Sequence, residues 1–239
     1  MTPLSRTILQ QHRIRKTKAQ KSAFLTQMRQ AFPELQPQDE KSRNIILGDP
    51  GHAKIIVSAH YNTGRQRFFA GYVTPKNPLT AVTMIGSKHI SADNTAGVVA
   101  LCELAQTLNA AQRHKIAFVF YDQKMPFSAE TLAIDLDCEP TGNHLLVAAN
   151  KIARQSWGEI LKHSFKPTSN KSILFANMEK VHIGRRRNLD NSVTISTLHQ
   201  KKHIGFYVKK GQVSENTVFD SANVKLICES IRNLLNKIS

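Results

Sequence analysis

Three side chains able to ligate a metal ion lie at the borders of apolar segments. His60 and Asp137 each come directly after a short apolar run, and Asp93 comes just before a segment with helical periodicity. Imidazole and carboxylate groups are ligands for zinc and other divalent ions. The three residues therefore indicate a candidate metal site. The plainer alternative is that Asp93 or Asn94 caps a helix and that His60 is a satisfied core histidine.

The elements that must position these side chains alternate between strands and helices. Continuous apolar runs predict buried strands, and apolar residues at helical spacing predict amphipathic helices. We expect strands at residues 44–47, 55–59, 116–121, 132–136, 145–149, 173–175, 193–198 and 204–208, and helices at 4–32, 95–108, 151–161 and 224–238. This order predicts an α/β fold with a mixed, mostly parallel sheet. In such sheets, functional side chains collect at the carboxyl ends of the strands.

Length and composition exclude several classes of protein. The chain has 239 residues, of which 41% are hydrophobic, so it has enough apolar side chains for a core and is not a disordered or low-complexity sequence. Its apolar runs are too short for a spanning helix, and its three cysteines are too scattered for a disulfide framework. We expect one cytoplasmic domain over residues 1–239, with residues 1–36 as an N-terminal basic helix packed on it.

The formal net charge of +16 is confined to two segments. Residues 1–32 hold seven basic residues and no acidic one, and residues 151–210 hold thirteen basic and three acidic residues. The second segment contains Arg185, Arg186 and Arg187, which are candidate anion-binding residues. Solvated charge that protects strand edges is the plainer explanation for these residues.

The order of the motifs resembles metallopeptidase family twenty-eight, the family of co-catalytic zinc aminopeptidases and glutaminyl cyclases. The resemblance runs from about residue 43 to the C-terminus and rests on His60-Tyr61-Asn62, Asp93-Asn94-Thr95-Ala96-Gly97-Val98, residues 118–122, Asp137 and residues 216–220. It implies a three-layer α/β/α sandwich with a two-zinc site. In that site, His60 and Asp137 would ligate the first zinc ion and Asp93 would bridge both ions. The opening segment with Arg13-Ile14-Arg15-Lys16 is similar to that of cytoplasmic bacterial members.

The same resemblance implies that the second zinc ion and the general base are lost. Lys124 and Met125 stand at the positions of the base and of a second-zinc ligand, and Gln212 stands at the position of the late second-zinc histidine. Asn62 replaces the Asp that orients the first histidine, although its side chain can still accept a hydrogen bond from the imidazole. One histidine and two carboxylates can hold one divalent ion. A lysine cation cannot take a proton from metal-bound water as a carboxylate does.

Three residues offer weaker substitutes for the missing groups. Glu130 follows the position of the base, Glu215 lies near the position of the lost histidine, and Cys138 follows Asp137. We expect the two acids to be exposed and the thiol to be buried and inert.

These features lead to one principal hypothesis and two alternatives. We expect an aminopeptidase-like protein that has lost its peptidase activity and acts as a binding or scaffold protein for a peptide or protein ligand. The first alternative is a mononuclear metal-dependent hydrolase of the same fold. The second is a protein that binds a polyanion, a nucleic acid or an acidic partner through its basic surface. The expected cofactor is one zinc or other divalent ion, with no metal at all as the competing outcome.

Overall fold

The computed structural model describes most of the chain. The described residues are 1–37, 43–63, 94–122, 131–178, 191–200 and 218–238, with the backbone alone of 65–66, 72–73, 90–91, 201 and 205–207. The helices are α1 (Pro3–Gln11), α2 (Lys18–Ala31), α3 (Thr95–Thr107), α4 (Ala110–Arg113), α5 (Lys151–Ser164) and α6 (Ser221–Lys237). The strands are β1 (Gln36–Pro37), β2 (Ile45–Leu47), β3 (Ile55–His60), β4 (Arg65–Gln66), β5 (Tyr72–Val73), β6 (Ile90–Ser91), β7 (Ile116–Tyr121), β8 (Leu132–Asp137), β9 (His144–Ala149), β10 (Ser172–Asn177), β11 (Ser192–Lys201) and β12 (Gly205–Tyr207).

Four parallel strands, β7, β3, β8 and β11, form the centre of the large sheet. β2 and then β1 extend the sheet beyond β7 in antiparallel fashion. On the other side, β9 pairs antiparallel with β11, and β10 pairs parallel with β9. The end of β11 continues into a pairing with β12, which in turn pairs with β5. The α/β class and the mixed sheet are therefore confirmed.

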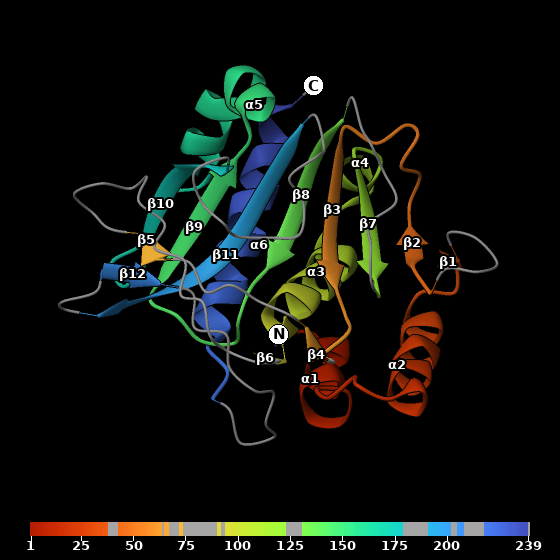
Figure 1. Cartoon of the computed structure of the whole chain (residues 1–239). Coiled ribbons are helices and arrows are strands. Elements are labelled where there is room, and N and C mark those ends of the chain that lie inside the picture. Colours follow the sequence, from red (N-terminus) through yellow and green to blue (C-terminus); the bar gives the residue numbers. More distant parts are fainter. Residues whose placement is uncertain are drawn as a thin grey trace.

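The described helices cover one face of this sheet (Figure 1). Alternate residues of a strand point to opposite faces, and in β3 the residues Ile55 and Val57 belong to the core cluster that the helices share. Ile56 belongs to a separate cluster on the opposite face, so His60 and, by the same alternation in β8, Asp137 also lie on that opposite face. Among the described residues no helix covers this second face, so the second helical layer of a three-layer sandwich is not seen there.

The predicted helix at residues 4–32 is two helices, which is a correction. The chain turns at residues 12–17, where Arg15 is fully buried and donates to the backbone carbonyls of Tyr61 and Arg13. Thr17 then begins α2 with a capping box, in which its side chain accepts from the Gln20 backbone and the Gln20 side chain accepts from the Thr17 backbone. Phe24 and Met28 of α2 lie in the main core cluster.

The other predicted elements that fall on described residues are found within a few residues of their expected limits. The three cysteines are buried thiols, and none of them forms a disulfide. In the described part of the chain, no helix combines the length and the apolar character that a membrane crossing requires.

Candidate metal centre

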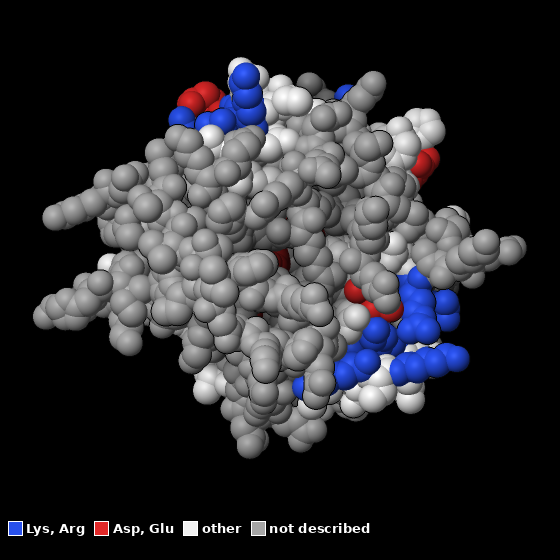
Figure 2. Space-filling view, in the orientation of Figure 1, with Lys and Arg blue, Asp and Glu red and all other residues white. Residues whose placement is uncertain are grey.

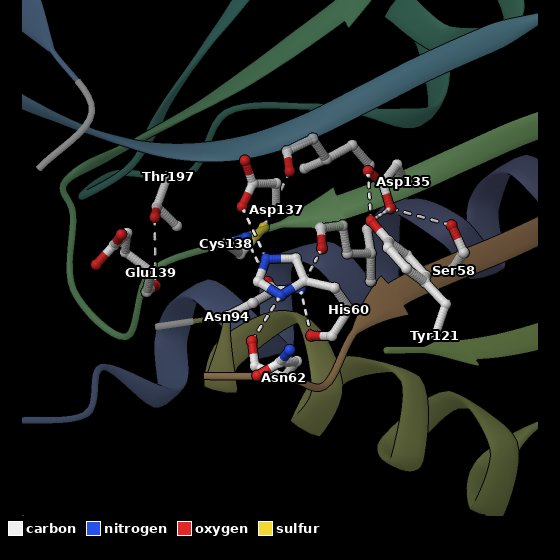
Figure 3. A network of polar contacts seen from close by, with 12 residues as sticks. Ser58, His60, Asn62, Asn94, Tyr121, Asp135, Asp137, Cys138, Glu139 and Thr197 are labelled. Carbon is white, nitrogen blue, oxygen red and sulfur yellow. Dashed lines mark hydrogen bonds and ion pairs between the residues drawn. The ribbon is translucent and has the colours of Figure 1, made fainter. Parts of the chain in front are cut away.

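His60 and Asp137 meet at the carboxyl ends of two neighbouring parallel strands. β3 and β8 pair directly, with Ala59 opposite Leu136. The His60 Nε2 atom lies 3.4 Å from Asp137 Oδ1, and the two residues are 2% and 5% exposed (Figure 3). The two side chains therefore converge at one edge of the sheet, as the order of the sequence motifs predicts.

The contact of the second ring nitrogen, His60 Nδ1, determines which nitrogen of the imidazole carries the hydrogen. His60 Nδ1 lies 3.2 Å from the backbone carbonyl oxygen of Asn62, and a carbonyl can only accept, so Nδ1 carries the hydrogen. In the neutral imidazole, Nε2 then presents a lone pair toward the Asp137 carboxylate. Two acceptors at this distance need a proton or a cation between them. The sequence allowed the Asn62 side chain to accept a hydrogen bond from the imidazole. This is corrected in one respect, because the acceptor is the backbone oxygen of Asn62.

The separation of the two side chains fits zinc. Zinc lies about 2.0–2.1 Å from a histidine nitrogen and about 2.0–2.2 Å from a carboxylate oxygen, so two ligand atoms of a tetrahedral site are about 3.3–3.5 Å apart. The observed 3.4 Å between His60 Nε2 and Asp137 Oδ1 matches this value. Within the described ranges, no three His, Cys, Asp or Glu side chains form a group that would hold a metal ion. Asp93, the predicted third ligand, lies outside those ranges.

Asn94 joins the two strand ends that carry the pair. Its Nδ2 donates to the backbone oxygens of His60 (3.1 Å) and Leu136 (2.7 Å), and its Oδ1 accepts from the Cys138 backbone N–H (2.7 Å). Asn94 does stand at the N-cap of α3, but its side chain makes no capping hydrogen bond. The expectation of a capping side chain there is therefore wrong for Asn94.

Gly97, the third residue of α3, leaves the space that Asn94 occupies. A Cβ atom at Gly97 would overlap Asn94 Oδ1 and would lie 2.9 Å from the Leu136 backbone oxygen. The helix therefore approaches the end of β8 more closely than any larger residue would allow.

A buried hydroxyl–carboxylate network lies on the same sheet face as His60, one row back along the strands. The Asp135 carboxylate is 2% exposed and accepts from Ser58 Oγ (3.1 Å) and from Tyr121 Oη (3.0 Å). The Tyr121 ring also packs edge-on against the His60 ring, with 6.0 Å between the centroids. Sequence reasoning did not assign this network. The alternation of Asp135 with Asp137 along one strand was the signal that could have found it.

The N-terminal segment contacts the residues that follow His60 and the start of α3. Arg15 Nε donates to the Tyr61 carbonyl (2.6 Å), its backbone N–H donates to Thr63 Oγ1 (2.7 Å), and its guanidinium also reaches Thr95 Oγ1 at the start of α3 (3.4 Å). The Arg15 guanidinium lies 5.3 Å from the centre of the Phe24 ring, which stacks on Tyr61. Burial is the main cause that raises the pKa of Tyr61 above its usual range. The residues that follow His60 are therefore held by α2 and by the turn before it.

Cys138 behaves as a structural residue. It is fully buried, and its Sγ donates to the Ile195 backbone oxygen at 3.2 Å. This bears out the expectation of a buried thiol. The remaining predicted site residues lie outside the described residues, so their predictions stay untested: Asp93, Lys124, Met125, Gln212, Glu130, Glu215, Arg185, Arg186 and Arg187.

Positive charge is visible over α2 in the part of the surface that the structure describes. Figure 2 shows a group of Lys and Arg side chains at the lower right, where Figure 1 places α2. Lys18 and Arg29 of α2 are exposed. Lys21 instead points inward and pairs at 2.8 Å with the buried Asp122, the residue that follows β7.

Solved structures with the same fold include zinc exopeptidases and glutaminyl cyclases. A zinc-dependent exopeptidase from Parabacteroides distasonis has a TM-score of 0.57 and 13% identity, over 98% of this chain and 96% of that chain. Glutaminyl cyclases from Bacteroides thetaiotaomicron, bound to N-acetylhistamine, and Porphyromonas gingivalis have TM-scores of 0.56 and 0.54 and identities of 17% and 14%. They cover 99% and 98% of this chain and 96% of each cyclase. No protein-family model and no curated protein matches the sequence. These similarities confirm the zinc-exopeptidase-like fold that the sequence resemblance implies.

Proposed function

We propose that this protein holds a single divalent metal ion with His60, Asp93 and Asp137 and binds a peptide or protein ligand without hydrolysing it. The observation that carries the metal part is the His60–Asp137 pair, whose facing atoms are 3.4 Å apart, as in a tetrahedral zinc site. The imidazole also carries its hydrogen on Nδ1, so Nε2 is the atom available to a metal. The fold shared with zinc exopeptidases supports the same assignment.

The loss of hydrolysis follows from the residues that stand at the base and second-metal positions. A bound zinc ion would polarise a carbonyl group or lower the pKa of a water molecule. Peptide hydrolysis also needs a group that takes a proton from water and delivers it to the leaving amine. In the resemblance to the zinc aminopeptidases, Lys124 stands at that position, and Met125 and Gln212 stand where the second-metal ligands would be. General acid–base catalysis alone is worth about 10²–10⁴-fold in rate.

A mononuclear hydrolase is the second candidate, and the same His60–Asp137 geometry favours it. It differs from the first candidate in one respect. A hydrolase needs a proton acceptor, and position 124 holds a lysine in place of a carboxylate. Hydrolysis in this case depends on the metal ligands and does not depend on Lys124.

An activity panel with two variants tests the proposal. The protein, supplied with one equivalent of zinc, is assayed for release of N-terminal residues and for cyclisation of an N-terminal glutaminyl peptide. Wild type is compared with Asp93→Asn and Lys124→Ala. We expect no turnover above that of Asp93→Asn. Turnover that persists in Lys124→Ala and disappears in Asp93→Asn would overturn the non-hydrolytic function and establish the mononuclear hydrolase.

A further inference from the structure

We infer that Asn94 is the positioning residue of this centre, whose side chain sets the separation between His60 at the end of β3 and Asp137 at the end of β8. The inference concerns the geometry of the pair and holds whether or not the centre hydrolyses peptides. Only the metal-affinity part of its test rests on the proposed function.

The first support is the complete use of a fully buried amide. Asn94 is 0% exposed, and both hydrogens of its Nδ2 go to backbone oxygens, one on His60 and one on Leu136, the residue before Asp137. Its Oδ1 accepts from the N–H of Cys138, the residue after Asp137. The amide therefore forms hydrogen bonds with β8 on both sides of Asp137 and with β3 at His60 itself. A carboxylate cannot do this, since it has no hydrogen to donate.

The second support is that Asn94 does not cap its own helix. The other described helices of the chain have an N-cap side chain that accepts from the backbone of the first turn, and Asn109 and Asn150 are two such residues. At Asn94 the backbone has φ −101° and ψ 31°, and the side chain is turned away from α3 toward the strands. The helix thus lacks a stabilising side-chain cap, and the amide forms its hydrogen bonds with the strand ends instead.

The third support is Gly97, whose lack of a side chain permits this close arrangement. Any Cβ at that position would overlap Asn94 Oδ1 and press on the Leu136 carbonyl at 2.9 Å. Asn94 therefore lies in the space that Gly97 leaves between α3 and β8, and in its observed orientation the amide satisfies three backbone groups.

The test compares Asn94 variants with a true capping asparagine. Asn94→Asp keeps the acceptor for the Cys138 N–H and replaces both donors by an oxygen. Asn94→Ser is uncharged and too short to span the two strands. Asn150→Ala is the matched control, because Asn150 caps α5 by accepting from Ala153 N–H at 2.8 Å. Asn150 follows Ala149, which pairs with Val193 near the start of β11, whereas Asp137 pairs with Ser196 further along that strand.

Two readouts separate positioning from general stability. The first is the long-range ¹H–¹⁵N spectrum of the metal-free imidazoles, with the His60 signals identified by their loss in His60→Gln. The second is zinc affinity by competition with a chromophoric chelator. We expect both Asn94 variants to shift the His60 ring signals and to weaken zinc binding by about 10–100-fold, as changes at residues that orient metal ligands do. Asn150→Ala is expected to lower stability and to leave both readouts unchanged.

Unchanged His60 signals in folded Asn94→Asp and Asn94→Ser, with stability losses like that of Asn150→Ala, would overturn the inference. If wild type binds no zinc, the proposed one-metal function fails, and the His60 spectrum still decides the role of Asn94. If Asn94→Asp does not fold, Asn94→Ser decides it by the same criteria.

Discussion

Alanine substitution at two helical glycines is expected to change stability in opposite directions. Gly158 in α5 faces open space, since a Cβ atom placed there would have no neighbouring atom within 4 Å. Gly158→Ala therefore gains helix propensity without a clash, which is worth about 0.8–1.0 kcal/mol. At about 2–4 °C per kcal/mol for a chain of this size, the midpoint of thermal unfolding should rise by about 2–4 °C.

Gly97→Ala makes the same chemical change where there is no room for it. The new methyl group would overlap Asn94 Oδ1 and lie 2.9 Å from the Leu136 oxygen, and overpacking of this kind costs about 1–3 kcal/mol. Displacing Asn94 also leaves buried backbone groups unpaired, at about 1–3 kcal/mol each. Counting one such unpaired group and subtracting the gain in propensity, we expect a net loss of about 1–5 kcal/mol and a fall in the unfolding midpoint of about 2–20 °C.

Chemical and thermal unfolding of wild type and the two glycine variants, followed by far-UV circular dichroism, measures both effects. The comparison needs no external reference, because each variant adds one methyl group to one helix. A Gly97→Ala protein as stable as wild type or Gly158→Ala would refute the close approach of α3 to β8 and the placement of Asn94 in the space that Gly97 leaves.

Further predictions concern other buried groups. Arg15→Met should lower the free energy of unfolding by about 2–4 kcal/mol, because the carbonyls it satisfies, such as that of Tyr61, cost about 1–3 kcal/mol each when unpaired. The exposed Arg6→Met is the control for urea unfolding, expected within about 0.5 kcal/mol of wild type. Burial raises the pKa of the Cys228 thiol to about 12, so Ellman's reagent at pH 8 should react far more slowly with native than with unfolded protein; a fast native burst would contradict this. Burial lowers the pKa of His144 from 6.5, so the unfolded chain binds the proton more readily and stability should fall as pH drops below about 6.5. His144→Gln should flatten that part of the profile, and an unchanged slope would count against it.

The sheet and the edge that carries His60 and Asp137 could be predicted because their signals are local. The apolar run at residues 116–121 coincides with β7 (Ile116–Tyr121), since a strand buried on both faces needs an unbroken apolar sequence. His60 and Asp137 each end such a run, and the parallel pairing of β3 with β8 brings them together. The sequence pattern was sufficient for this part of the site.

The supporting contacts could not be predicted because they depend on tertiary structure. Nothing in the local sequence shows that Asn94 ties two strands together when an asparagine before a helix is typically a cap. Arg15 lies in a basic segment with helical periodicity, so its burial and the break between α1 and α2 were missed. His60 Nδ1 donates to the backbone oxygen of Asn62, a contact that no side-chain comparison can reveal.

The most direct test of the one-metal centre is the number of zinc ions that each chain retains. Wild type and Asp137→Asn are equilibrated with excess zinc, passed through a desalting column and measured by elemental analysis. We predict one zinc ion per wild-type chain and none per Asp137→Asn chain, with both proteins folded. Two zinc ions per wild-type chain, no zinc in wild type, or equal retention by the two proteins would contradict the proposed centre.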